Sequence, residues 1–230
     1  MRKQQKIWSK EHIKNASIPK LASTTAASSV IYFLNYVAST TIHPPRKIVD
    51  IGCGKGRNTI YLAQKGLIVF AMDYIEHAIT YTKQLAKNCG VEHAVTLLVQ
   101  AIDRRWPFTD NFFDLAIDNY SSIDIETKKG RDTYKNELLR TLKPGGRALV
   151  CVVSADDGLE QEMQKTNPGK EIHSTIWPSG KFQKNYDEKE LRTFYKEFEI
   201  MKLEKISQPA FKLGKKYVAT DYRMILRKPA

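Results

Sequence analysis

One run of 17 residues constrains the fold of this chain more than any other stretch. It extends from Lys47 to Ala63 and reads KIVDIGCGKGRNTIYLA. Its apolar start predicts a buried strand, its end favours a helix, and between them stand three glycines spaced by two, Gly52, Gly54 and Gly56. This order is typical of a βα turn in which a nucleoside-bearing cofactor lies against bare backbone.

Apolar runs of strand length alternate with helical patterns from Lys47 to Val153. The expected strands are Lys47–Ile51, Ile68–Met72, Thr96–Ala101, Leu115–Asn119 and Arg147–Val153. The expected helices are Asn58–Lys65, Ile75–Asn88 and Asp132–Leu142. Apolar strands that alternate with helices are typical of a parallel sheet covered on both faces. We therefore predict an α/β fold, a Rossmann-like doubly wound sheet that is mostly parallel.

The C-terminal part of the chain departs from this alternation. Residues 154–186 are polar and contain several Gly and Pro, which is typical of a lid or a substrate-binding insert. A helix is expected over Asp187–Lys196, and two extended runs, Glu199–Lys205 and Tyr217–Arg227, predict an antiparallel last strand. At 230 residues we expect one domain. Its parts would be a helical cap (1–46), a cofactor-binding core (47–153), the insert (154–186) and a final helix with strands (187–230).

The N-terminal part indicates neither a signal peptide nor a membrane span. The first ten residues, MRKQQKIWSK, lack an apolar core. Leu21–Pro45 has no charged residue, but its dense apolar part, Val30–Ala38, is too short to cross a bilayer. Helical spacing in that part predicts an amphipathic helix packed on the domain through Val30, Phe33, Leu34 and Val37. We expect no membrane partner.

Cysteine content and charge limit the other partners. Three cysteines, Cys53, Cys89 and Cys151, have no metal-ligand spacing, so we expect no metal and a reducing, cytoplasmic location. The net charge of +12 comes from the two ends, since residues 1–50 and 181–230 each carry +6. Basic ends can attract nucleic acid. A solvated lysine-rich surface is favoured, because no basic run is interleaved with aromatic residues.

The glycine turn discriminates between two cofactor classes. Dinucleotide folds use G-x-G-x-x-G, whereas this chain has Arg57 at the position of the third glycine. Asp50 before the turn would repel a diphosphate, but it suits the amino group and sulfonium of S-adenosylmethionine. Asp73 ends the second strand 21 residues after Gly52, where a carboxylate binds ribose hydroxyls or caps a helix. Tyr74 could pack on adenine.

Four segments in this order resemble one family. They are DIGCGKG (Asp50–Gly56), Met72-Asp73, WPFTDNFFDLAIDN (Trp106–Asn119) and ELLRTLKPGGRALV (Glu137–Val150), the last with Pro144-Gly145-Gly146 as a turn. The chain resembles class I S-adenosylmethionine-dependent methyltransferases over about residues 45–153. GCGKGRNTIYLA and Tyr186–Glu199 are more loosely similar to the small-molecule branch that contains tellurite-resistance and thiopurine-type enzymes.

The resemblance implies cofactor-binding roles for ten residues. Asp50, Gly52 and Gly54 would hold the methionine part and Asp73 the ribose. Adenine would meet the segment at Ile102 and Asp103, although the acid stands one place later than in the family. The remaining members of the implied set lie in the glycine turn and after the second and fourth strands: Cys53, Asn58, Tyr74 and Asp118.

The resemblance also implies the reaction, an in-line displacement in which the enzyme aligns the two reactants and excludes water. A soft anionic nucleophile needs no base, whereas an alcohol or amine needs one. The catalytic group remains unknown, with Tyr120 and His173 as candidates. Trp8 and Trp177 could form a lid over the sulfonium by cation–π contact, and His77 is expected to be solvated.

We predict transfer of a methyl group to a small-molecule acceptor, with S-adenosylhomocysteine as product, by a monomer or a homodimer. The alternatives are an RNA or protein methyltransferase that uses the basic ends, and a non-catalytic binder of the cofactor.

Overall fold

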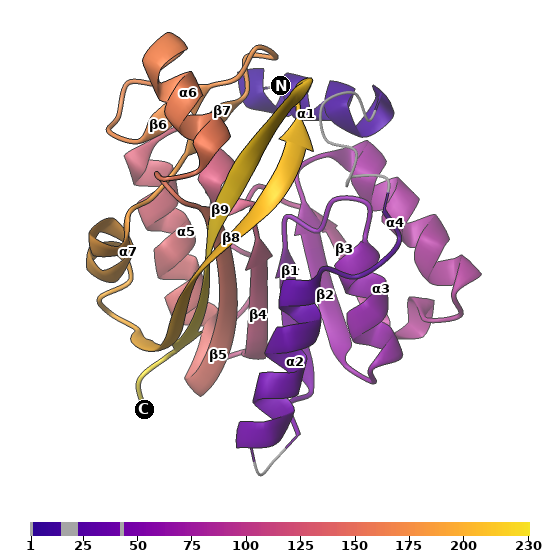
Figure 1. Ribbon diagram of the computed structural model, residues 1–230. Coiled ribbons are helices and arrows are strands. Elements are labelled where there is room, and N and C mark those ends of the chain that lie inside the picture. Colours follow the sequence, from indigo (N-terminus) through magenta and orange to yellow (C-terminus); the bar gives the residue numbers. More distant parts are fainter. Residues whose placement is uncertain (1, 15–22, 42–43) are drawn as a thin grey trace.

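The protein is built around a seven-stranded sheet with helices on both faces (Figure 1), and the computed structural model describes residues 2–14, 23–41 and 44–230. The strands are β1 (Lys47–Ile51), β2 (Ile68–Asp73), β3 (Val95–Val99), β4 (Phe113–Asn119), β5 (Leu142–Val153), β8 (Glu199–Lys212) and β9 (Lys215–Arg227). The helices are α1 (Lys3–Lys14), α2 (Ser28–Thr40), α3 (Arg57–Gln64), α4 (Glu76–Asn88), α5 (Lys128–Thr141), α6 (Gly158–Thr166) and α7 (Glu188–Phe194). Two 3₁₀ turns, η2 (Glu92–Ala94) and η3 (Ser122–Asp124), and a two-stranded sheet of β6 (Ser174–Ile176) and β7 (Phe182–Lys184) complete the described elements.

The strand order is β3-β2-β1-β4-β5-β9-β8, with β1 paired in parallel with both β2 and β4. The chain therefore reverses its direction of winding between β1 and β4, and ligands of open α/β sheets bind at the carboxyl ends of the strands at such a point. β9 lies antiparallel between β5 and β8. The predicted mostly parallel sheet with an antiparallel last strand is thus confirmed.

Alternating residues of β1 contribute to two apolar cores. Val49 packs in the core that contains Tyr134 and Leu138 of α5, whereas Ile48 packs in the core under α2 and α3. Ile48 and Val49 are both fully buried, as the apolar pattern predicts. The uncharged N-terminal stretch forms α2, whose Val30, Phe33 and Val37 are buried in the second core. No helix among the described residues is long and apolar enough to span a bilayer.

Three parts of the fold differ from the sequence prediction. Pro144-Gly145-Gly146 belongs to β5 and does not form a free turn. The pairing of β5 with β4 is irregular at this point and accommodates the positive φ of Gly145, +75°. The helix predicted from Asp132 already begins at Lys128, after the Thr127 side chain accepts a hydrogen bond from the Gly130 N–H. β8 and β9 are longer than predicted and meet at a two-residue turn.

The insert (residues 154–186), whose polar sequence predicts a lid or a substrate-binding insert and no regular elements, contains helix and strands. It contains α6, β6 and β7, which are held around the buried carboxylate of Glu160. That carboxylate accepts hydrogen bonds from Trp177 Nε1 (3.0 Å), the Thr175 hydroxyl (2.5 Å) and Asn185 Nδ2 (3.0 Å). Buried polar groups need such partners, and a core made this way leaves no hydrophobic period in the sequence.

Candidate cofactor and acceptor site

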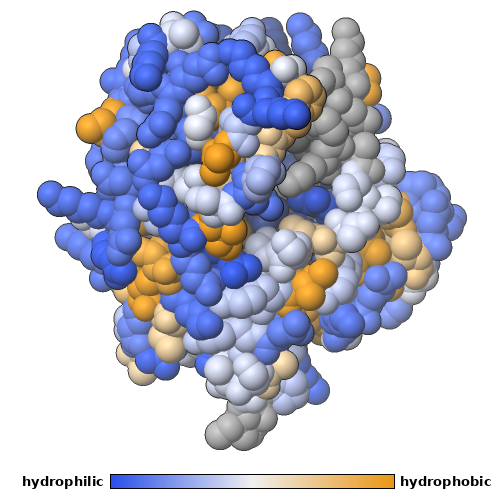
Figure 2. Space-filling view, viewed as in Figure 1, coloured by the Kyte–Doolittle hydropathy of each residue, from blue (hydrophilic) through white to orange (hydrophobic). Residues whose placement is uncertain are grey.

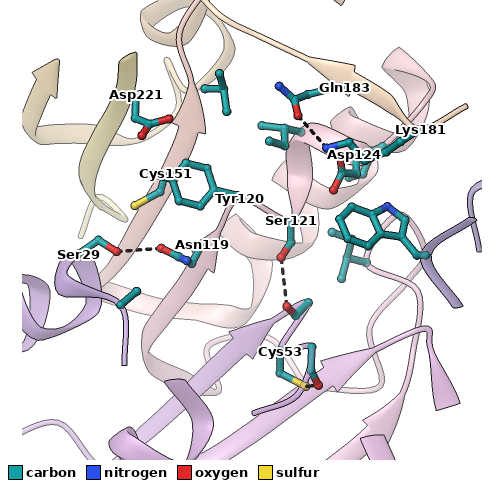
Figure 3. A pocket seen from close by; sticks show the side chains of 18 of the residues that line it. Ser29, Cys53, Asn119, Tyr120, Ser121, Asp124, Cys151, Lys181, Gln183 and Asp221 are labelled. Carbon is teal, nitrogen blue, oxygen red and sulfur yellow. Dashed lines mark hydrogen bonds and ion pairs between the residues drawn. The ribbon is translucent and has the colours of Figure 1, made fainter. Parts of the chain in front are cut away.

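A cavity of about 1690 Å³ opens at the carboxyl ends of β1, β2 and β4 (Figure 3). Small-molecule pockets usually measure about 300–1,000 Å³, so this one has room for two reactants. We call the part formed by the glycine turn and the end of β2 the cofactor half. The part formed by Tyr120, η3, the insert and the β8–β9 hairpin is the acceptor half.

The glycine turn approaches its neighbours too closely for side chains. Gly52 and Gly56 have φ of +68° and +81°, a region that L-residues avoid. A Cβ at Gly52 would overlap the Ser121 hydroxyl, and one at Gly56 would overlap Thr82. Gly54 instead faces the cavity, where the nearest atom to its added Cβ would be His12 Cε1 at 3.4 Å. The glycines therefore serve both tight packing and an exposed backbone surface.

Two buried carboxylates flank this turn and line the cavity. Asp50 Oδ2 accepts a hydrogen bond from the Thr59 hydroxyl at 2.6 Å, and burial raises the pKa of Asp50 to about 7. Asp73 accepts from the backbone N–H of Gly54 (2.9 Å) and of Ile75 (2.8 Å), and burial raises its pKa to about 6. Because burial disfavours the charged form, a cationic ligand here would stabilise both carboxylates.

The adenine-side residues also reach the cavity. Tyr74, Ile102 and Asp103 line it, and burial raises the pKa of the Tyr74 phenol. Asp103 is not free, because Arg2 Nη1 donates to both of its carboxylate oxygens at 2.6 Å. The Asp103 carboxylate, which the resemblance places at the adenine, is thus already paired with Arg2 of the N-terminal segment.

Cys53 and Asn58 line the cofactor half, with roles that the sequence does not reveal. Burial raises the pKa of the Cys53 thiol, so it stays protonated and unreactive. Asn58 Oδ1 accepts a hydrogen bond from the Ala27 N–H at 3.0 Å. Asn58 therefore ties the start of α2 to the helix that follows the glycine turn.

Two of the predicted site residues do not reach this cavity. The Asp118 carboxylate accepts hydrogen bonds from the Ser121 N–H and the Tyr134 hydroxyl, both at 2.7 Å, so it shapes the end of β4. His173 Nδ1 lies 2.8 Å from Glu190 Oε2 beside a separate cavity of about 310 Å³. His77 is exposed on α4, as predicted.

Tyr120 is the predicted catalytic candidate that does line the cavity. Its φ is +70°, a backbone conformation that is rare for a bulky residue. Residues in such conformations cluster at functional sites. Burial raises the pKa of its phenol strongly, and the nearby carboxylate of Asp221 raises it further. Figure 3 shows Asp221, which comes from β9, beside the Tyr120 ring. No signal in the sequence could have found Asp221, because only the pairing of β5 with β9 brings it to this edge.

The two tryptophans proposed as a lid line the cavity, but lysines occupy their faces. Lys181 Nζ lies 4.0 Å from the Trp177 ring centroid and 5.4 Å from that of Trp8. Lys212 Nζ also lies 4.0 Å from Trp177, and burial lowers the pKa of Lys212 to about 8. Lys181 is also 3.6 Å from Asp124 Oδ1. These contacts fasten the acceptor half rather than leave a free aromatic face.

The helix α1 lines the cavity beside the glycine turn, and Trp8 is its only residue in the sequence-based site. Gln5 donates to the Tyr74 carbonyl at 2.8 Å, and Gln4 donates to the Gly180 carbonyl of the insert at 3.1 Å. His12 is 4% exposed, and its Nδ1 has no hydrogen-bond partner among the described residues. Burial and the nearby Lys55 lower its pKa to about 4, so the imidazole is neutral. α1 thus joins the two halves.

Comparisons with known proteins agree with this architecture. A family model described as a methyltransferase domain matches residues 42–199. A demethylmenaquinone methyltransferase of Clavibacter sepedonicus is 34% identical over 123 residues, which cover 51% of this chain and 46% of that protein. A 2-heptyl-1-hydroxyquinolin-4(1H)-one methyltransferase of Mycobacteroides abscessus is 29% identical over 46% of this chain and 45% of its own length. The chain therefore spans about half the length of these relatives.

Solved structures share the fold. A Methanosarcina mazei S-adenosylmethionine-dependent methyltransferase aligns with a TM-score of 0.73 at 23% identity, over 84% of this chain and 97% of that one. A Burkholderia thailandensis 1,6-didemethyltoxoflavin-N1-methyltransferase, solved with 1,6-didemethyltoxoflavin and S-adenosylhomocysteine, aligns with a TM-score of 0.68 at 18% identity, over 98% of this chain and 87% of that one.

The fold and the glycine turn together define a protein of the doubly wound α/β class that is built to bind a nucleoside-bearing cofactor. More particularly, this chain belongs to the methyltransferase domain family, that of the class I S-adenosylmethionine-dependent methyltransferases.

Proposed function

We propose that this chain transfers a methyl group from S-adenosylmethionine to a small-molecule acceptor. The observation that carries the proposal is one cavity with two differently built halves. Its cofactor half presents the bare backbone of Gly54 between the carboxylates of Asp50 and Asp73. Its acceptor half holds the Tyr120–Asp221 pair. The positively charged part of the cofactor lies beside the carboxylates of Asp50 and Asp73, and the acceptor half of the cavity is left for the methyl acceptor.

The Tyr120–Asp221 pair supports an acceptor that loses a proton as it is methylated. The bond from the methyl carbon to the acceptor oxygen or nitrogen forms as the methyl–sulfur bond breaks, and sulfur keeps the electron pair, leaving S-adenosylhomocysteine. The proton of the acceptor passes to the Asp221 carboxylate. The neighbouring Tyr120 hydroxyl orients that carboxylate. Burial in the cavity excludes water from the methyl group.

The elements that surround the site favour a small acceptor over a nucleic acid or a protein segment. α1, the insert and the β8–β9 hairpin all line the cavity, so a chain-like substrate would have to displace one of them. The relatives from Clavibacter sepedonicus and Mycobacteroides abscessus are named for a demethylmenaquinone and a 2-heptyl-1-hydroxyquinolin-4(1H)-one, neither of which is a nucleic acid or a protein, and this supports the same class here.

Calorimetric titration with S-adenosylhomocysteine tests the cofactor half. We expect Asp73→Asn to weaken binding by about tenfold to a hundredfold, because hydrogen bonds to a charged partner contribute about 1.5–3 kcal/mol. Asp110→Asn is the matched control, since that carboxylate is exposed and pairs with Arg140 outside the cavity. A wild-type chain that binds neither S-adenosylmethionine nor S-adenosylhomocysteine would refute the proposal.

A further inference from the structure

The β8–β9 hairpin extends beyond the sheet to which it belongs. β5 pairs with β9 only over Asp221–Arg227, whereas β8 and β9 pair with each other up to Lys212 and Lys215. We call residues 208–219, whose strands pair only with each other, the arm. Figure 1 shows it as two yellow strands that rise past the other strands towards α1 and α6. A two-residue turn, Leu213-Gly214, closes the arm.

Leu213 occupies a turn position that suits other residues. Both turn residues have positive φ, +51° at Leu213 and +76° at Gly214. Two-residue turns of this kind strongly prefer Asn, Asp or Gly at the first position, because a bulky L-residue is strained there. The Leu213 side chain is also 42% exposed, although it is apolar. Neither the backbone nor the solvent favours this residue, and such violations of local rules tend to mark functional positions.

Exposed apolar side chains gather around this turn. Nine large hydrophobic residues are exposed in the described part of the chain, and three of them lie in the arm: Phe211 at 70%, Leu213 at 42% and Val218 at 54%. Large exposed apolar groups that cluster indicate a contact surface, whereas scattered ones do not. The arm therefore carries a contact surface at its tip.

The two faces of the arm have different surroundings. Lys212 and Lys215 form a cross-strand pair, and they contact Trp177 and Glu162 of the insert. Phe211 is paired with Lys216, and Lys216 forms no ion pair with any described residue. One face is thus fastened to the insert, and the other presents apolar groups with an unpaired lysine.

The charge around the tip indicates what that face contacts. Residues 205–220 contain four lysines and no acidic residue, and Lys216 is the one among them with no ion pair or ring contact to a described residue. Of the others, Lys205 pairs with Asp156, Lys215 pairs with Glu162 and Lys212 lies over Trp177. Apolar side chains among lysines are the composition of elements that lie in the interface of an anionic bilayer. In Figure 2, viewed as in Figure 1, hydrophobic and strongly hydrophilic atoms lie side by side at the upper end of the arm.

We propose that the arm docks this chain on the surface of an anionic lipid bilayer. Phe211, Leu213 and Val218 enter the interface, and Lys216 meets the negative headgroups. The sequence predicts no membrane partner because it holds no spanning segment, whereas this contact is peripheral and arises from the hairpin. Phe211, Lys212 and Tyr217 also line the cavity, so docking places the acceptor half beside the lipid.

Flotation with lipid vesicles tests this proposal on the full chain. We expect binding to vesicles of phosphatidylcholine and phosphatidylglycerol in a three-to-one mixture, and little binding to phosphatidylcholine alone. Phe211→Ser/Leu213→Asn should lower the partition coefficient by about tenfold or more, as expected for two large apolar side chains kept in water. Lys216→Gln should lower it by about fivefold, since each lysine near an anionic surface contributes about 1 kcal/mol.

The choice of variants separates docking from folding and from catalysis. Leu213→Asn fits the turn better than leucine, so the thermal midpoint should stay equal or rise while vesicle binding falls. Ile172→Ser is the control, because Ile172 is 73% exposed but lies in the insert. Titration with S-adenosylhomocysteine should be unchanged in the Leu213→Asn, Lys216→Gln and Ile172→Ser variants, since none of these three residues lines the cavity.

Two results would overturn the proposal and leave the proposed methyl transfer untouched. One is a wild-type chain that does not bind the mixed vesicles at low salt. The other is equal binding by the wild type and the Phe211→Ser/Leu213→Asn variant, which would point to a different surface. A tip that binds a protein instead of lipid would give the first result.

Discussion

The cofactor half and the acceptor half of the cavity are built in different ways. Strands and a glycine turn from one continuous stretch form the cofactor half, and its acids are held by backbone N–H groups and a neighbouring hydroxyl. The acceptor half is assembled from distant segments by buried polar side chains, with Glu160 at the centre of the insert. The first is fixed by local backbone geometry, and the second by side-chain hydrogen bonds that other sequences could replace. This difference suits a site whose donor stays constant while its acceptor varies.

The largest effect is expected at the glycine turn. Gly52→Ala should abolish cofactor binding and destabilise the fold, because the new Cβ would overlap the Ser121 hydroxyl at a φ of +68°. Gly66→Ala is the matched control, since Gly66 also has positive φ, +85°, but no atom within 4 Å of an added Cβ. The difference between their free energies of unfolding should be about 1–3 kcal/mol, the cost of overpacking. Equal values from chemical denaturation would contradict the close packing that we assign to the turn.

The next largest effect is expected at Glu160, and it tests whether the two halves of the cavity are independent. Glu160→Leu removes the acceptor of the Trp177, Thr175 and Asn185 hydrogen bonds, and each buried donor left without a partner costs about 1–3 kcal/mol. Proteolysis should then cut the insert first, while affinity for S-adenosylhomocysteine stays within about twofold. Glu162→Gln, on the exposed side of α6, should leave the insert resistant. A comparable loss of cofactor affinity in Glu160→Leu would show that the halves are not independent.

The buried acids predict a pH dependence of the cofactor half. With pKa values of about 7 for Asp50 and about 6 for Asp73, the folded chain holds protons that the unfolded chain releases above about pH 4. Stability therefore falls as pH rises from about 4 to about 7. S-adenosylmethionine favours the ionised acids, so its affinity should increase by up to about tenfold per pH unit over the upper part of this range. Calorimetry with Asp50→Asn should give a flatter profile, and an unchanged one would refute the assignment.

The smallest effect concerns the helix that joins the two halves. His12→Ala should weaken binding of S-adenosylhomocysteine by about fivefold, since one neutral hydrogen bond contributes about 1 kcal/mol. Its Nδ1, which has no partner in the part of the chain that the structure describes, and its place beside Gly54 motivate this expectation. Lys10→Ala, on the exposed side of α1, is the control. If both variants bind as the wild type does, His12 only fills space.

The sequence predicts the cofactor half far better than the acceptor half, for a physical reason. The strand β1 and the position of Asp73 follow from apolar runs and from glycine spacing, which are local properties. Nothing local marks Asp221, which reaches the cavity through the pairing of β9 with β5. The folded insert escapes prediction because Glu160 and its partners replace an apolar core. Asp118 has the right position along β4, but Tyr134 and Ser121 already occupy its carboxylate.

The contacts that hold α1 on the cavity are not predicted, for a similar reason. The sequence of α1, KQQKIWSKEHIK, is mostly polar, so it has no apolar stripe that would indicate packing. It is held instead by single hydrogen bonds from Gln4 and Gln5 and by the ion pair of Arg2 with Asp103. Polar contacts of this kind depend on the final positions of both partners, and a hydrophobic pattern cannot report them.

The position of β9 has a consequence for how the protein is made. β8 joins the sheet through β9 alone, yet β9 follows β8 in the chain. While the polypeptide is being synthesised, β8 leaves the ribosome before the strand with which it pairs. The edge of β5 that pairs with β9 is unpaired until then. Only when Lys215–Arg227 has emerged can both strands enter the sheet together, and with them Asp221. The acceptor half can therefore be completed only after β9 has been synthesised, whereas the strands of the cofactor half are available earlier.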